Sequence, residues 1–170
     1  MKTDRAVSLG IQEKAGGEYV HMGVKKGIQN HITSTIDQSD MLVFIVNIDG
    51  LPIFKSSGLS FWPILMRIAN ANYNKPFVVG LFSGITKPKN IEEYLSDFVS
   101  EMTSVLTDGV TVGNRHFRVV LKCIIANAPA LAMIKCIKSH CGYFGCPRCI
   151  QEGSPAANCI VFLNRFLAAH

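Results

Sequence analysis

Four segments of the sequence have the hydrophobic pattern of β-strands. Residues 41–49 form a nearly continuous apolar run, and the glycine and proline that follow predict a turn into residues 52–57 as the hairpin partner. Residues 76–82 form a third apolar run. Residues 116–126 are apolar at every second position and largely apolar on the other face too, which is typical of a strand covered on both sides. In such a strand Cys123 is expected to be a small buried residue.

Helical spacing is clearest over residues 91–106, where apolar side chains recur at i, i+3, i+4 and i+7. Asn90 followed by Glu93 is typical of a capping box at the start of this helix. Residues 60–69 are predicted to form a short helix because a proline lies in their first turn. Residues 18–32 have a weaker helical pattern that two glycines interrupt.

The sequence predicts a hairpin before the strand at residues 116–126 and a helix after it. A glycine–asparagine pair after residues 110–112 predicts a tight hairpin into this strand. After the strand, Pro129 suits the first turn of a helix, and apolar residues at helical spacing run from Ala130 to Cys141. The order is therefore strand, strand, strand, helix, strand, helix. Three antiparallel strands followed by a helical crossover to a parallel strand are the topology of an α/β RNase H-like mixed sheet.

Composition places the chain among globular proteins. Its 170 residues are 48% hydrophobic and 17% charged, which is enough for the core of one domain. No apolar run reaches the roughly 18 residues that a membrane span needs. The charged N-terminus has no apolar stretch behind it. We therefore expect neither a membrane partner nor secretion.

Charge is distributed unevenly along the chain. The formal net charge is +5, and no acidic residue occurs between Gly109 and Gln151. Six basic residues lie in that stretch: Arg115, Arg118, Lys122, Lys135, Lys138 and Arg148. Basic side chains beside a strand end can face the phosphates of a nucleic acid, which makes DNA a candidate partner. The alternative is a solvated surface that binds nothing.

The six cysteines all fall within residues 123–159. Without a secretion signal, such a cluster indicates thiols or metal ligands rather than disulfides. Cys146 and Cys149 form a C-x-x-C pair, and Cys136 and His140 precede it at a helical i, i+4 spacing. Thiolate and imidazole ligands at these spacings predict a tetrahedral Zn²⁺ site. A redox C-x-x-C is the alternative, but that motif follows a strand and begins a helix, whereas this one follows a turn with two glycines.

Four segments resemble animal transposase-domain proteins, which are similar to CACTA-type cut-and-paste DNA transposases. The segments are residues 47–57, 61–68, 75–101 and 134–153, and the resemblance covers residues 18–153. It implies an RNase H-like nuclease with three catalytic carboxylates (a DDE triad), interrupted by a zinc-binding insertion. It also implies a nuclear location, the alternative being cytoplasmic. The implied chemistry is phosphodiester hydrolysis and strand transfer by two Mg²⁺ ions held on carboxylates.

In this resemblance Asp49 occupies the first metal-ligand position, and Asn127 stands where the family has its second aspartate. The third carboxylate should follow the Cys/His region, and Glu152 lies too close to that region to be it. An asparagine oxygen has no charge to offset Mg²⁺, so catalysis is expected to be lost. The simpler alternatives are that Asp49 ends a strand in an Asp-Gly turn and that Asn127 caps the following helix.

The expected organisation has four parts: a flanking segment (1–40), a partial transposase core (41–133), a zinc-binding insertion (134–153) and an unrelated C-terminal tail (154–170). The chain is predicted to be a truncated, catalytically inactive fragment of a DNA transposase. Two alternatives stay open. One is a non-catalytic DNA- or zinc-binding module, and the other is an active nuclease whose missing glutamate comes from another chain.

Overall fold

The computed structural model divides the chain into two compact units, Met1–Ile125 and Ala126–His170. The residues that the structure describes are 10–32, 39–53, 58–71, 75–138, 142–146, 148, 150–157 and 159–162. Within these residues the first unit holds the main sheet and two helices. The second unit holds a short helix and a two-stranded hairpin.

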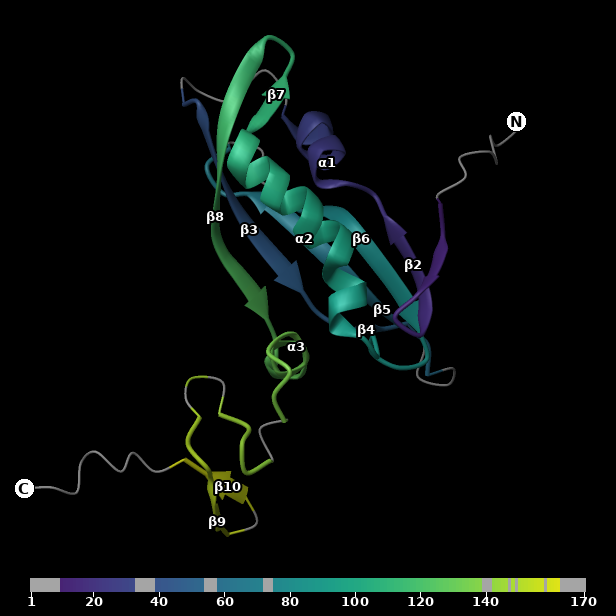
Figure 1. Ribbon diagram of the computed structural model, residues 1–170, viewed down its shortest axis with the longest axis vertical. Helices are drawn as coiled ribbons and strands as arrows, with labels where there is room; N and C mark the ends of the chain where they lie inside the picture. The colour runs from purple at the N-terminus through teal and green to yellow at the C-terminus, as the bar shows by residue number, and fades with distance from the viewer. Residues whose placement is uncertain are drawn as a thin grey trace, which may run out of the picture. The chain divides into compact units, whose positions relative to one another are not determined.

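The first unit is built on one mixed sheet, with strands in the order β1-β2-β6-β5-β3-β8-β7 and with β4 paired to β5 (Figure 1). The strands are β1 (Gln12–Lys14), β2 (Gly17–His21), β3 (Met41–Ile48), β4 (Leu51–Pro52), β5 (Ser60–Ile68), β6 (Phe77–Gly84), β7 (Val110–Val112) and β8 (Arg115–Ala126). Strands β3 and β8 are parallel. The Arg118 N–H donates to the Asp40 carbonyl, and the Asn47 side-chain amide donates to the Ile125 carbonyl, so the two strands advance together.

The predicted α/β topology with a mixed sheet is confirmed. Strand β3 pairs antiparallel with β5, and β5 pairs antiparallel with β6. The chain then crosses through α2 (Ile91–Asp108) and the β7–β8 hairpin, which also forms as predicted, to the parallel strand β8. Helices α1 (Val24–His31) and α2 both lie in front of the curled sheet in Figure 1.

The predicted helix over residues 60–69 is wrong, because this segment is the long strand β5. The proline in this segment favours a helix in the sequence. In the structure, Pro63 lies between the residues of β5 that pair with β3 and those that pair with β4. Strand β3 pairs with β5 only as far as Ile64, and β4 pairs only with Ser60 and Phe61. A proline is tolerated where its missing N–H is not needed by the ladder. Strand β5 is therefore the partner of β3, in place of residues 52–57, of which 54–57 lie outside the described residues.

The N-terminal part of the chain differs from the single weak helix predicted over residues 18–32. Strand β2 adds to the sheet beside β6, and α1 follows after Gly23, whose φ is +95°. Strand β1 then pairs with β2 as a hairpin at the edge. A short alternating strand beside a short helix has no long run of either period, so the sequence pattern alone is ambiguous.

Helix α2 begins where its sequence predicts. The Asn90 side chain accepts a hydrogen bond from the Glu93 N–H at 3.1 Å, which confirms the predicted N-cap. The helix continues to Asp108, two residues beyond the predicted end, and stops at Gly109. Its apolar stripe is buried against the sheet through Tyr94, Phe98, Met102 and Val105.

Strand β8 is covered only over its first half. Phe117 and Val119 are buried, but Cys123, Ile124 and Ile125 are exposed, with Ile124 47% and Ile125 50% exposed. The prediction of a buried Cys123 is therefore wrong. Coverage on both sides is wrong for the whole strand, because His116 and Arg118 on the other face of its first half are exposed as well. The physical reason for the second half is the short neighbour: β7 pairs only with the first three residues of β8.

The second unit begins with α3 (Ala128–Ile134) and contains the hairpin β9 (Ser154–Ala156) and β10 (Cys159–Val161). The helix is shorter than the predicted run to Cys141. Its end is a Schellman motif, in which the Ile137 N–H donates to the Ala132 carbonyl and the Cys136 N–H donates to the Met133 carbonyl. Cys136 takes the left-handed position of this motif, with a φ of +52°, where glycine is the usual residue.

Candidate functional site

Asp49 follows directly after β3 and is half-buried. Its Oδ1 accepts a hydrogen bond from the Gly50 N–H at 2.7 Å. Gly50 is needed for packing as well, because a Cβ there would lie 2.7 Å from the Trp62 ring. The chain does not turn back here, because β3 and β4 both pair antiparallel with β5 and follow one another along it. The interpretation of Asp49 as part of a turn is therefore wrong, and its metal-ligand role stays a prediction.

Asn127 follows β8 and is the N-cap of α3. Its Oδ1 accepts a hydrogen bond from the Ala130 N–H at 2.9 Å, which confirms the capping interpretation. Asn127 belongs to the second unit and Asp49 to the first. The expectation that the two side chains share an ion stays a prediction.

The predicted zinc ligands are only partly described. Cys136 is exposed and lies beyond the end of α3, so it is not on a helix face, and Cys146 is half-buried. His140 and Cys149 lie outside the described residues. Within the described ranges no group of three His, Cys, Asp or Glu side chains could hold a metal ion. The zinc site stays a prediction.

The six basic residues are divided between the two units. Arg115 already has protein partners: its Nη2 lies 3.1 Å from Asp40 Oδ1 and 3.3 Å from the Ser39 carbonyl, and its guanidinium lies 4.8 Å from the centre of the Phe117 ring. Arg118 and Lys122 are exposed on β8. The second unit exposes the other three: Lys135, Lys138 and Arg148. The two units thus offer separate sets of cations to a phosphate ligand.

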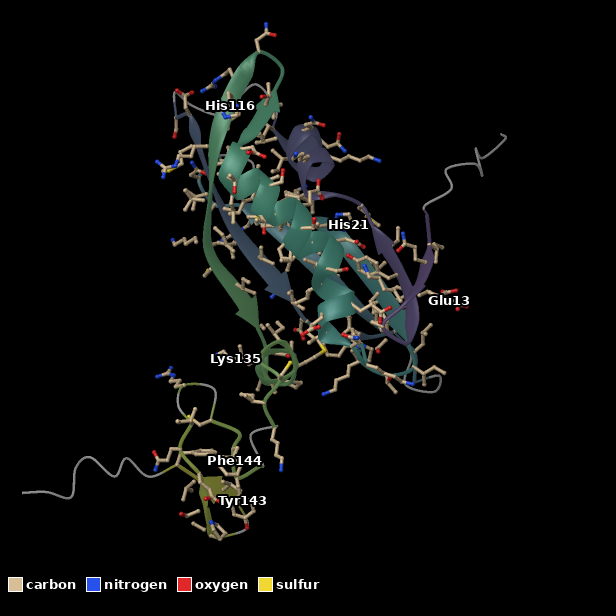
Figure 2. The ribbon with its side chains drawn as sticks, in the orientation of Figure 1. Glu13, His21, His116, Lys135, Tyr143 and Phe144 are labelled. Carbon is tan, nitrogen blue, oxygen red and sulfur yellow. The ribbon has the colours of Figure 1, made fainter. Side chains whose placement is uncertain are left out.

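Sequence reasoning missed a polar cluster between β2 and the two helices. His21 Nε2 lies 2.7 Å from Glu101 Oε2, and the Tyr19 hydroxyl lies 3.3 Å from His21 Nδ1 (Figure 2). Glu101 also accepts hydrogen bonds from the backbone N–H groups of Val24 at 2.7 Å and Lys25 at 2.9 Å. Because Gly23 has no side chain to cap α1, a glutamate of α2 caps it instead.

A second ion pair extends this cluster. Lys14 Nζ lies 2.6 Å from Asp97 Oδ2 and 4.9 Å from the centre of the Tyr19 ring. Burial raises the pKa of Tyr19 well above its ordinary value, and the negative charges of Asp97 and Glu101 act in the same direction. The only signal in the sequence was the i, i+4 spacing of Asp97 and Glu101 on one helix face. The cluster holds the β1–β2 hairpin and α1 to α2, which is a structural role.

The Glu101 carboxyl has a lowered pKa. Partial burial acts to raise it, but hydrogen bonds from the Lys25 and Val24 N–H groups and from His21 outweigh burial and hold the pKa below the ordinary value of 4.5. A lowered pKa in the folded state contributes stability above the unfolded pKa, and this contribution is lost as pH falls through the folded pKa.

We therefore expect Glu101→Gln to lower the free energy of unfolding by about 1–3 kcal/mol at neutral pH, since charge-assisted hydrogen bonds are lost. The difference from the wild type should shrink as pH falls below 4.5. Urea denaturation across pH measures it. Glu92→Gln, on the exposed side of the same helix, is the matched control. A difference that does not change with pH would contradict the ionic origin of the stabilisation.

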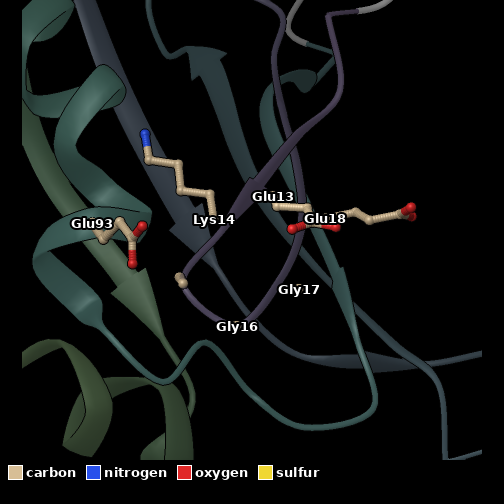
Figure 3. A pocket seen from close by; sticks show the side chains of 7 residues that line it. Glu13, Lys14, Gly16, Gly17, Glu18 and Glu93 are labelled. Carbon is tan, nitrogen blue, oxygen red and sulfur yellow. The ribbon is translucent and has the colours of Figure 1, made fainter.

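A hollow of about 450 Å³ lies at the turn of the β1–β2 hairpin (Figure 3). Three of its lining side chains are carboxylates, Glu13 and Glu18 from the hairpin and Glu93 from α2. Its one cation, Lys14, is paired with Asp97. A surface of this charge repels phosphate, so the hollow is not the predicted nucleic-acid contact.

No protein-family model, curated protein or solved structure matches the chain. Among the described residues, none of the helices has both the length and the apolar character to cross a membrane.

Proposed function

We propose that this chain is part of an RNase H-like DNA transposase core that no longer cuts DNA. The observation that carries the proposal is the strand order β6-β5-β3-β8, in which β8 is parallel to β3 and follows a helical crossover. In such a fold, metal-binding carboxylates stand at the ends of the first and fourth strands. Asp49 follows the first strand, β3, and Asn127 follows the fourth, β8.

Loss of catalysis follows from the residues at these two ends. Two-metal hydrolysis needs anionic ligands that hold both ions about 4 Å apart, and Mg²⁺ is usually held by carboxylates. Asn127 is neutral, and its Oδ1 is already bonded to the Ala130 N–H. Glu152 is the only acidic residue after Asp108 in the sequence, and it lies three residues after Cys149. A neutral amide thus fills the position of the second carboxylate.

We expect neither the wild type nor Asn127→Asp to cleave labelled duplex DNA with Mg²⁺ or Mn²⁺. Asn127→Asp restores only the second of the three carboxylates, because Glu152 lies too close to Cys149 to be the third. Each lost transition-state contact costs several kcal/mol, and about 1.4 kcal/mol is a factor of ten in rate. Aspartate is also a preferred N-cap, so Asn127→Asp should fold normally. Gel analysis of the labelled strands gives the result, and Asp49→Ala is the control for contaminating nucleases. Cleavage by the wild type that disappears in Asp49→Ala would instead establish an active nuclease.

A non-catalytic DNA- or zinc-binding module is the second candidate, favoured by the exposed cations of both units. Their side chains are Arg118, Lys122, Lys135, Lys138 and Arg148. If this candidate is right, the chain should bind the same duplex without metal, and its affinity should fall between roughly 50 and 200 mM salt, because phosphate contacts release counterions. In this second candidate, Cys146 and Cys149 would bind Zn²⁺, and the protein would be located in the nucleus.

A further inference from the structure

The main sheet of the first unit has a second face that α1 and α2 do not cover. The backbone N–H groups at the start of α1 bond to Glu101 of α2, and Tyr94 of α2 packs on Phe82 of the sheet. Both helices therefore lie on the face that carries Phe44, Val46, Ile64, Met66 and Phe82 (Figure 1). The opposite face, called the outer face here, carries the alternate residues of the same strands.

The centre of the outer face is mostly apolar. Its polar side chain on β3 is Asn47, opposite Leu65, and the Asn47 amide donates to the Ile125 carbonyl. The apolar side chains come from four neighbouring strands and are Val43, Ile45, Leu65, Val78, Leu81 and Val120, all half-buried. Met41 and Ile124 extend this surface and are 41% and 47% exposed. An antiparallel sheet that faces water carries polar residues on that side. A contiguous apolar surface of this kind marks a contact surface instead.

Cations lie around this apolar centre. Arg67 on β5 is paired with Ile45 in the register, and Arg118 and Lys122 lie on β8 on either side of Val120. Among the described outward positions of β3, β5, β6 and β8 there is no carboxylate. Asp40, directly before β3, is paired with Arg115, and Glu18 lies further along the sheet on β2. The surface therefore combines aliphatic contacts with positive charge.

We propose that the outer face docks an amphipathic α-helix of a partner protein, with aliphatic residues along one stripe and Asp or Glu beside it. A helix is the element that packs on a sheet face to bury an apolar stripe. The carboxylates beside the stripe would pair with Arg67, Arg118 and Lys122. This inference is independent of the proposed transposase ancestry.

Two other occupants fit the surface less well. A second copy of the chain, which carries a net charge of +5, would bring one cationic face against another. Duplex DNA would satisfy the cations, but its charged backbone offers no apolar surface against which the aliphatic centre of the outer face could be buried. The partner that satisfies both the apolar centre and the cations is acidic and amphipathic.

Two synthetic helical peptides of about 18 residues test the proposal. They share one leucine stripe and differ only in having Glu or Lys beside it. Fluorescence anisotropy with the full chain should show the acidic peptide binding at least about tenfold more tightly, and Ile45→Gln should weaken it by about tenfold. The double variant Arg118→Glu, Lys122→Glu should reverse the preference. Val99→Gln, at an exposed apolar residue of α2, is the matched control and should change nothing.

Several results would overturn the proposal. Equal affinity for the two peptides, or no binding of the acidic peptide at about 1 mM, would show that no such helix docks. A dimer that Ile45→Gln dissociates would assign the outer face to a second copy. If duplex DNA displaced the acidic peptide, and if the Arg118→Glu, Lys122→Glu variant no longer bound that DNA, the outer face would be assigned to nucleic acid. Circular dichroism confirms that each variant is folded, and Leu65→Gln replaces Ile45→Gln if that variant is not.

Discussion

Gly109→Ala should lower the free energy of unfolding by about 3 kcal/mol or more, because two separate effects oppose any side chain at this position. Gly109 joins α2 to β7 with a φ of +72° and a ψ of −165°, a region that essentially only glycine adopts. A Cβ there would lie 2.5 Å from the Phe117 carbonyl oxygen and 2.6 Å from His116 Nε2. The first of these atoms is backbone of β8 and can move only if the strand shifts. Urea denaturation at neutral pH measures the loss.

The matched control is Gly113→Ala, in the turn between β7 and β8. Gly113 also has a positive φ, of +60°, but no atom lies within 4 Å of the place that a Cβ would take. Only the backbone conformation is then unfavourable, at about 1 kcal/mol. Equal losses for the two variants would show that the close approach of Phe117 and His116 to Gly109 contributes nothing.

Tyr94→Ala should cost about 3–5 kcal/mol, the range for removal of a large buried ring. Tyr94 is completely buried, and its hydroxyl donates to the Trp62 carbonyl at 3.1 Å. Its ring meets the rings of Tyr19 and Phe82 edge-on, with centres 6.0 and 6.1 Å apart. One side chain therefore connects α2 to β2, β5 and β6, and its loss leaves a cavity where these elements meet.

Tyr94→Phe separates the hydroxyl from the ring. It keeps the edge-on contacts and removes only the hydrogen bond to Trp62, so we expect a loss of about 1 kcal/mol. Burial raises the pKa of Tyr94 far above its ordinary value, so the hydroxyl stays protonated at any pH that the folded protein experiences. If Tyr94→Phe were as damaging as Tyr94→Ala, the hydrogen bond, and not the ring, would be the main anchor of α2.

The strands and the long helix are predictable where one period continues over many residues. Strands β3 and β6 and helix α2 have such runs, and the Asn90 cap of α2 depends on a residue only three positions away. The sequence of strand β5 predicts a helix instead, because its proline suits a first helical turn. Whether a proline fits a strand depends on which residues stand opposite it, and these are set by the whole sheet.

The polar cluster around Glu101 could not be predicted in the same way. Val24 and Glu101 are 77 residues apart in the chain, and the cap of α1 exists only once α2 has packed beside it. Two glycines weaken the helical pattern of residues 18–32, and the N-cap of α1, Gly23, has no side chain that could bond to the first turn. The outer face likewise depends on which side of the sheet the helices occupy, and no local pattern specifies that side.

By itself, the sequence determined the properties that depend on near neighbours: the long periodic elements, the Asn90 and Asn127 caps and the uneven charge. Tertiary structure alone decided that Arg115 pairs with Asp40 and that β8 loses its cover after Val119. The physical reason is the range of the interactions. The caps of α2 and α3 are hydrogen bonds over a few residues. Strand pairing, burial, ion pairs and the Glu101 cap of α1 join residues far apart, and the complete fold selects them.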